Sequence, residues 1–231
     1  GATAESACPA GTYSGSGASE CTGCDVGFYA SATGLSSCLL ADAGQYVDSV
    51  GSSQQTSCPI GFYSGTGATA CSACLPGSFS NETFGATSCD TVGGGYFTSV
   101  SGASKPTVCP AGKFSGSGAV KCEECSVSTY TAQDGSTSCS LVDAGFFVGT
   151  TGASFQEPCR PGWYSGTGAS ECSACEPGRY SDTDTATDCA LVVGGYYVAA
   201  SGSSEASSCA AGRYSGAGAI YCTLCPDGTT S

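Results

Sequence analysis

The sequence contains no histidine and no methionine, a single tryptophan, Trp163, and a single asparagine, Asn81. Without histidine, the serine and cysteine nucleophiles that rely on an imidazole base are excluded. Leu, Ile, Val and Phe together make up only 31 of the 231 residues, too few for a conventional hydrophobic core. A chain with so few large apolar side chains needs another source of stability in order to fold.

Positive charge is also scarce. Six Lys and Arg residues stand against 19 Asp and Glu residues, which gives a net charge of −13. Phosphate groups are repelled by so acidic a surface, so we expect neither nucleic acid nor anionic membranes as partners. The sequence also lacks a signal peptide, an apolar run long enough to cross a membrane and any helical period. We therefore expect no direct membrane insertion and little or no helix.

Cysteine is abundant instead, with 19 residues. Small units that cannot bury enough apolar area are typically held together by disulfides. Disulfides persist in oxidising compartments, so we expect an extracellular protein, either secreted or on the cell surface. The chain begins at Gly1 rather than at Met and stops inside a repeat, so we expect it to be a mature segment of a longer protein.

A stretch of seventeen residues that begins at Cys8 returns along the chain. Residues 8–24 read C-P-x-G-x-Y-S-x-x-G-x-x-x-C-x-x-C, and the pattern starts again after steps of 50, 51, 50 and 50 residues. A period of this length indicates an array built from one small unit. The predicted organisation is the end of a preceding repeat (1–7), four repeats (8–57, 58–108, 109–158 and 159–208) and a partial fifth repeat (209–231).

A shorter period divides each repeat into three loops. An aromatic residue recurs every 16 to 18 positions, two places after a glycine except at Ser128. We interpret each loop as two short strands: in the first, a type I turn over Cys8–Gly11, a strand with Tyr13, and a reversal at Gly15–Gly17 that leads back to Cys21. Because neighbouring strand residues point to opposite faces, we expect the repeated aromatic to be buried and the residue before it exposed. The aromatic positions are Tyr13, Tyr29, Tyr46, Tyr63, Phe79, Phe97, Phe114, Tyr130, Phe147, Tyr164, Tyr180, Tyr197 and Tyr214.

The third loop of each repeat lacks the opening cysteine. A mostly aliphatic pair such as Leu141-Val142 stands there instead, and the aromatic is doubled in three of the repeats. On an extended segment, one member of each doubled pair faces away from its own loop. We therefore predict a candidate interface with neighbouring chains or repeats, with packing between loops of the same chain as the alternative. The outward members are Tyr96, Phe146 and Tyr196.

The repeated stretch, followed in most repeats by G-x-[YF] and a further Cys, resembles the ephrin-receptor-like cysteine-rich repeat. It is also similar to the first sub-module of tumour-necrosis-factor-receptor cysteine-rich domains, although the further crossed disulfide of those domains is missing. The resemblance covers essentially the whole chain. It implies a small disulfide-rich, mostly β or irregular fold: an elongated tandem-repeat rod of short two-stranded loops with little or no helix. It implies no enzymatic activity and no cofactor.

The resemblance also implies that the first cysteine of a repeat pairs with the second, and the third with the fourth. Cys225 is then unpaired in this segment. The implied disulfides are Cys8–Cys21, Cys24–Cys38, Cys58–Cys71, Cys74–Cys89, Cys109–Cys122, Cys125–Cys139, Cys159–Cys172, Cys175–Cys189 and Cys209–Cys222.

Other chemistries compete for some of these residues. The four cysteines of a repeat also suit a zinc site, and Cys21 and Cys24 suit a redox pair, but no repeat contains a second C-x-x-C and no βαβ pattern surrounds the pair. The acidic segment from Asp182 to Asp188 resembles the start of a calcium loop, but it lacks the central glycine and has Val193 in place of the bidentate glutamate. We favour disulfides and a solvated acidic turn, with no metal ion.

Asn81 opens an N-glycosylation sequon, Asn81-Glu82-Thr83, in the turn predicted after Phe79. We expect a glycan on this side chain, since sequons in exposed turns of secreted proteins are the ones that are used.

The regularity of the chain favours a structural role over a specific binding or catalytic site. We predict a non-enzymatic extracellular protein that forms part of a filament, surface coat or stalk, with copies of itself or other extracellular structural proteins as partners. The alternative is an adhesion or receptor ectodomain that binds a protein ligand along the rod. In that case the three lysines of the chain, Lys105, Lys113 and Lys121, are the candidate contact with the ligand. The simpler interpretation is that these lysines are ordinary surface charges in contact with water.

Overall fold

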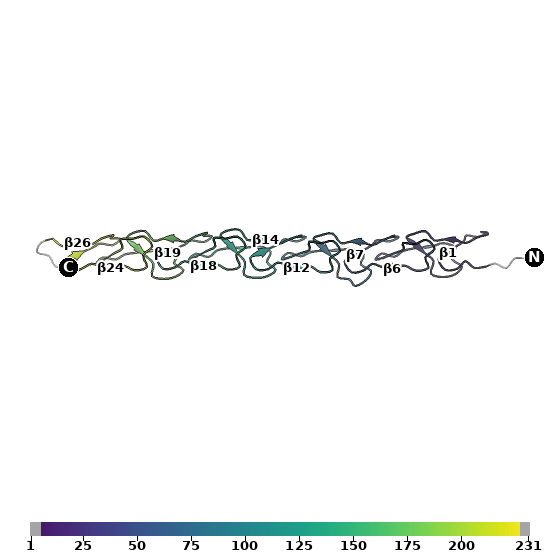
Figure 1. Cartoon of the computed structure of the whole chain (residues 1–231), viewed down its shortest axis with the longest axis horizontal. Helices are drawn as coiled ribbons and strands as arrows, with labels where there is room; N and C mark the ends of the chain where they lie inside the picture. Colours follow the sequence, from purple (N-terminus) through teal and green to yellow (C-terminus); the bar gives the residue numbers. More distant parts are fainter. Residues whose placement is uncertain (1–5, 227–231) are drawn as a thin grey trace, which may run out of the picture. The chain divides into compact units, whose positions relative to one another are not determined.

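The structure, a computed structural model, describes residues 6–226 of the chain. Within this range thirteen two-stranded antiparallel hairpins follow one another, joined by turns and irregular loops, and none of the described residues is helical (Figure 1). Strands pair in chain order, β1 with β2 through β25 with β26, and each has only two residues. The predicted disulfide-rich, mostly β or irregular fold of short two-stranded loops is confirmed.

The chain divides into two compact units, one of Gly1–Val108 with Gly116–Cys122 and one of Cys109–Ser115 with Glu123–Ser231. The strands of the first unit are β1 (Thr12–Tyr13), β2 (Thr22–Gly23), β3 (Phe28–Tyr29), β4 (Leu39–Leu40), β5 (Gln45–Tyr46), β6 (Thr56–Ser57), β7 (Phe62–Tyr63), β8 (Ser72–Ala73), β9 (Ser78–Phe79), β10 (Asp90–Thr91), β11 (Tyr96–Phe97) and β12 (Thr107–Val108). Those of the second unit are β13 (Lys113–Phe114), β14 (Glu123–Glu124), β15 (Thr129–Tyr130), β16 (Ser140–Leu141), β17 (Phe146–Phe147), β18 (Glu157–Pro158), β19 (Trp163–Tyr164), β20 (Ser173–Ala174), β21 (Arg179–Tyr180), β22 (Ala190–Leu191), β23 (Tyr196–Tyr197), β24 (Ser207–Ser208), β25 (Arg213–Tyr214) and β26 (Thr223–Leu224).

A tight turn opens each hairpin, and the first hairpin shows its geometry. The Thr12 N–H donates to the Pro9 carbonyl over 3.1 Å, and Gly11, the third residue of this turn, has a φ of +88°. A positive φ at the third position is typical of a type II turn and favours glycine. The predicted type I turn over Cys8–Gly11 is therefore wrong. The Gly11 N–H instead donates to the Ala30 carbonyl of the next hairpin, over 2.9 Å.

Within each unit, main-chain hydrogen bonds join every hairpin to the next in the same way. In the second unit, Gly145 N–H donates to Ser165 O (2.9 Å) and Val148 N–H to Ala169 O (3.1 Å). In the first unit, the corresponding bond runs from Gly44 N–H to the next hairpin over 2.9 Å. An isolated two-stranded hairpin is marginal in water. Stability therefore comes from the contact between neighbours, as in other repeat proteins.

The buried residues are small. Cys24, Cys74, Val142 and Ala30 are fully buried. Most of the other small residues that follow the repeated aromatic are also buried, whereas Ser14 and Ser215 are half-buried. The repeated aromatics themselves are only half-buried, and Tyr214 is exposed. The predicted aromatic core is therefore wrong, because hairpins with two-residue strands cannot cover a ring on all sides, whereas they can enclose a sulfur atom, a methyl group or a valine.

Candidate functional site

Disulfides close the first and second hairpins of a repeat. Their partners are separated by 13 to 15 residues, with Cα atoms 5.6–5.8 Å apart. The bonded pairs are Cys8–Cys21, Cys24–Cys38, Cys58–Cys71, Cys74–Cys89, Cys125–Cys139, Cys159–Cys172, Cys175–Cys189 and Cys209–Cys222, the pairs that the resemblance implies.

The remaining cysteines complete this framework. Cys109 and Cys122 are each engaged in a disulfide as well, and among residues 6–226 Cys225 is a free thiol. Cys21 and Cys24 belong to different hairpins and each is bonded to another cysteine. The C-x-x-C motif at Cys21 and Cys24 is therefore the junction between two hairpins, and each of its cysteines is bonded to a cysteine outside the motif.

The third hairpin of a repeat is closed without cysteine. In the third repeat, Val142 takes the place of the opening cysteine and its N–H donates to the Ser128 carbonyl over 3.1 Å. Gln156 takes the place of the closing cysteine. Its Nε2 donates to Asp143 Oδ2 and its Oε1 accepts from the Asp143 N–H, both over 2.8 Å. Two hydrogen bonds thus span the 13 residues that a disulfide spans elsewhere.

The same Gln–Asp pair closes the third hairpin of the first repeat. Gln55 accepts from the Asp42 N–H over 2.7 Å and donates to its carboxylate over 2.5 Å. The second and fourth repeats have Pro106 and Ala206 at the position of the glutamine, and neither side chain can form this pair. These pairs were not predicted from the sequence, although it places a glutamine thirteen residues after an aspartate, which is the spacing of the disulfides.

The three candidate interface residues occupy equivalent positions in the third hairpins. Tyr96 is 42% exposed and Tyr196 is 43% exposed, whereas Phe146 is half-buried. Tyr96 lies directly opposite Val108, which is 40% exposed, so both side chains stand on one face of hairpin β11–β12. Tyr96 belongs to the first unit and the other two belong to the second.

Elsewhere the equivalent side chain packs inside the chain. A Cβ at Gly102 would lie 3.3 Å from the Phe62 ring, and one at Gly202 would lie 3.5 Å from Nε1 of Trp163. These rings therefore cover the loop glycine of the hairpin two places further on. Phe62 and Trp163, which directly precede the repeated aromatic in their hairpins, therefore pack between loops of the same chain, as the alternative to an intermolecular interface requires.

Tyr196 also lines a pocket of about 210 Å³ in the second unit, together with Tyr180, Val193, Asp182 and Glu205. Its volume is below the ~300–1,000 Å³ that small-molecule sites usually have. Because Val193 is 64% exposed and two carboxylates line the pocket, its surface combines apolar and acidic groups.

A second hollow, of about 400 Å³, departs from the repeat pattern. Arg160 stands where three other repeats have proline, and its guanidinium carbon lies 4.9 Å from the centre of the Trp163 ring. Phe147 and Glu171 also line this hollow. A cation over an aromatic ring is mutually stabilising, by about 0.5–1 kcal/mol at an exposed site. Trp and Arg are residue types enriched among strong contacts at protein interfaces.

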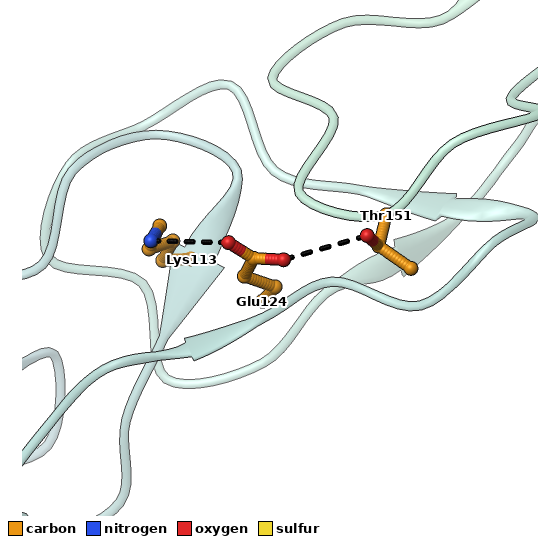
Figure 2. A network of polar contacts seen from close by, with 3 residues as sticks. All are labelled: Lys113, Glu124 and Thr151. Carbon is orange, nitrogen blue, oxygen red and sulfur yellow. Dashed lines mark hydrogen bonds and ion pairs between the residues drawn. The ribbon is translucent and has the colours of Figure 1, made fainter.

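The three lysines have different surroundings. Figure 2 shows Glu124 between two partners: Lys113 Nζ lies 3.2 Å from Oε1, and Thr151 Oγ1 donates to Oε2 over 3.4 Å. Both side chains of this ion pair are largely exposed, at 40% and 54%, so it contributes less than about 1 kcal/mol. Lys105 and Lys121 are exposed and have no ion pair among the described residues. They belong to the first unit, whereas Lys113 belongs to the second.

The acidic turn and the sequon both lie in second-hairpin loops. In the acidic turn, Asp188 Oδ1 accepts a hydrogen bond from the Cys189 N–H over 2.7 Å. No three His, Cys, Asp or Glu side chains within residues 6–226 are grouped so as to hold a metal ion. Asn81 is exposed in the loop between β9 and β10.

Comparison with known families connects this framework to one type of module. Residues 11–58 and residues 112–159 match the family described as tyrosine-protein kinase ephrin type A/B receptor-like. The chain contains ephrin-receptor-like repeats. The matched segments together make up less than half of the chain, and each runs from a turn glycine to the first cysteine of the next repeat. Comparison with curated proteins gave no match.

The ephrin-receptor-like repeat is a non-enzymatic, cysteine-rich module of the receptor and adhesion type. Together with the many disulfides, it is typical of extracellular or cell-surface proteins. Among the described residues, no helix is both long and apolar enough to pass through a membrane.

Proposed function

We propose that this chain is a structural segment of an extracellular filament, surface coat or stalk, and that the ephrin-receptor-like repeats are its disulfide-closed building blocks. The main-chain ladder between successive hairpins carries this proposal. In the second unit the Gly168 N–H donates to the Val142 carbonyl over 2.8 Å, and in the first the Gly67 N–H donates to the Ala41 carbonyl over 2.7 Å. Such bonds recur at every step within a unit, whatever the side chains are. A structure held by its backbone in this way tolerates variation at the surface while keeping one geometry.

An extended form follows from the proposal, because a ladder between neighbours adds length with each hairpin. A compact globular chain of this length has a radius of gyration of about 17 Å. Small-angle X-ray scattering of the oxidised protein should give a clearly larger value, and a value near 17 Å would contradict the extended form.

Assembly requires a surface that contacts other copies, and we assign it to the third hairpins. Tyr96 and Tyr196 are exposed aromatics on two-residue strands, and the pocket beside Tyr196 has room for one partner side chain. Aromatic residues are enriched in the buried centres of protein interfaces, because they bury a large area with little loss of side-chain entropy.

Electron microscopy of the native material tests the proposal. Ordered fibres or sheets should be seen for the wild type, and they should shorten or disappear when Tyr96, Phe146 and Tyr196 are all changed to Ser. The matched control changes Phe28, Phe84 and Tyr221 to Ser, three exposed aromatics outside the third hairpins, and should leave the assemblies intact. Unchanged assemblies in the first variant would refute this interface.

A second candidate function is an adhesion or receptor ectodomain that binds a protein ligand. Two observations favour it: the exposed Lys105 and Lys121, and the hollow around Arg160 and Trp163, which differs from the other repeats. Binding of the purified chain to intact cells, measured by flow cytometry, should then fall when Lys105, Lys113 and Lys121 are changed to Gln. Isolated molecules on a membrane, with no fibres, would favour this function over the structural one.

A further inference from the structure

The loop between β9 and β10 differs from the equivalent loops of the other repeats. Its disulfide, Cys74–Cys89, spans 15 residues, whereas the corresponding disulfides Cys24–Cys38, Cys125–Cys139 and Cys175–Cys189 span 14. The additional residue lies between the repeated aromatic and the loop glycine, Gly85. This is also the loop that contains the Asn81-Glu82-Thr83 sequon.

An aromatic residue is exposed beside the sequon. Phe84 precedes Gly85 directly, at the position that Thr33, Asp134 and Asp184 occupy in the other repeats. Its side chain is 71% exposed, although its backbone is held in place by an isolated antiparallel bridge to Pro59. A large apolar side chain thus takes the place of small or charged residues and remains in contact with water.

The sequon itself is accessible. Asn81, Glu82 and Thr83 are all exposed, and the loop has no regular structure around them. N-linked acceptors lie in such surface segments of secreted proteins. An exposed apolar ring three residues after an accessible acceptor, on a backbone held by a bridge, offers a surface on which the non-polar face of a sugar ring can pack, which removes apolar area from water.

We propose that Asn81 carries an N-linked glycan and that its first sugars cover Phe84. The donor is a lipid-pyrophosphate-linked oligosaccharide of the secretory pathway. A bond forms between Asn81 Nδ2 and C1 of the first sugar, the bond between C1 and the pyrophosphate oxygen breaks, and the amide nitrogen loses one proton. The inserted residue, the sequon and the exposed Phe84 then have a single explanation: this loop is built for modification. The inference does not depend on whether the chain forms filaments or binds a ligand.

Mass spectrometry of the chain secreted from eukaryotic cells tests the modification. Peptides containing Asn81 should carry a glycan, which Asn81→Gln and Thr83→Ala should both abolish and Thr83→Ser should preserve. A secreted, correctly disulfide-bonded chain with unmodified Asn81 would overturn the proposal and would leave the structural function intact.

A double-mutant cycle tests the role of Phe84. We compare the wild type, Asn81→Gln, Phe84→Thr and the double variant, with Thr chosen because Thr33 occupies the position in the first repeat. Asn81→Gln should lower the melting temperature by about 2–4 °C in the wild type, the shift of one modest contact in a protein of this size. It should have no effect when Phe84 is replaced.

The same four proteins made in a bacterial host that lacks N-glycosylation provide the control. Here Asn81→Gln should be neutral both with Phe84 and in the Phe84→Thr background, since no sugar is present. Two results would overturn the assignment of Phe84 as the surface that the sugar covers. One is that Asn81→Gln lowers the melting temperature of the glycosylated proteins equally with Phe84 and with Phe84→Thr. The other is that Asn81→Gln lowers the melting temperature of the bacterial proteins only when Phe84 is present.

Discussion

Replacing Gly61 by alanine should disrupt the contact between hairpins that are two places apart. Gly61 opens hairpin β7–β8 with a φ of +82°, and a Cβ at this position would overlap the carbonyl group of Gly102, with 2.7 Å to its carbon. Real Cβ atoms do not approach backbone so closely, so one of the two hairpins has to move. The equivalent contact recurs within both units, for example between Gly162 and Gly202.

Two costs add up at this position. A non-glycine residue in the left-handed region costs about 1–2 kcal/mol, and forcing extra volume into a packed contact costs about 1–3 kcal/mol more. We therefore expect Gly61→Ala to lower the free energy of unfolding by roughly 2–5 kcal/mol. Gly51→Ala provides the matched control, because Gly51 has a φ of +76° but a Cβ there meets no atom within 4 Å. It should show the conformational cost alone.

Guanidinium unfolding of the oxidised proteins measures the overall effect, and amide hydrogen exchange measures it locally. The Gly102 N–H donates to the Cys74 carbonyl over 2.7 Å, so its protection reports on the affected contact. The excess cost of about 1–3 kcal/mol in Gly61→Ala should appear as about 5- to 150-fold faster exchange than in Gly51→Ala. Gly65→Ala, with open space and no positive φ, should be near neutral or slightly stabilising. Equal losses in Gly61→Ala and Gly51→Ala would refute the close-packing argument and leave only backbone conformation.

Two further changes test other parts of the framework. Gln156→Ala should lower the free energy of unfolding by about 1 kcal/mol, because two hydrogen bonds to Asp143 are lost. In the same denaturation assay Gln54→Ala, at an exposed position, should have no effect. Equal effects of the two changes would show that the Gln–Asp pair does not close the hairpin. Thr185→Gly should raise the free energy of unfolding by roughly 0.5–1 kcal/mol, because Thr185 has a φ of +61°. Glycine relieves the strain of this conformation, although it loses more conformational entropy on folding. A lower free energy of unfolding would mean that contacts of the threonine side chain outweigh the strain of its backbone.

The composition and spacing of the chain were sufficient to predict much of the fold. The interval between aromatics divides the chain into two-stranded loops, and the structure has one hairpin for each aromatic, with the aromatic as the second residue of the first strand. Glycine two places earlier could be recognised as a turn residue, since few other residues tolerate its φ. The type of turn could not be assigned correctly, because Pro9 and Gly11 suit either of two adjacent four-residue windows, and the choice depends on a hydrogen bond to the next hairpin.

The candidate sites depend more strongly on contacts distant in sequence. Tyr96 and Tyr196 can be recognised in the sequence as members of doubled aromatics, but their exposure depends on the loops that pack around them. At the equivalent position in the first hairpin of two repeats, Phe62 and Trp163 instead pack against a loop glycine. The exposure of Phe84 is likewise a property of its loop, since nothing in the residue itself distinguishes it from a buried phenylalanine.

By itself, the sequence determined the number of hairpins, the boundaries between them and the need for disulfides, because these follow from periodic local chemistry and from the scarcity of large apolar residues. The tertiary structure alone decided what fills the interior. Cysteine sulfurs, Val142 and small residues such as Ala30 occupy it, while Tyr13 and the other repeated aromatics stay at its edge. The reason is geometric: the backbones of hairpins two places apart approach so closely, as at Gly61 and Gly102, that the space between them admits small side chains and excludes rings.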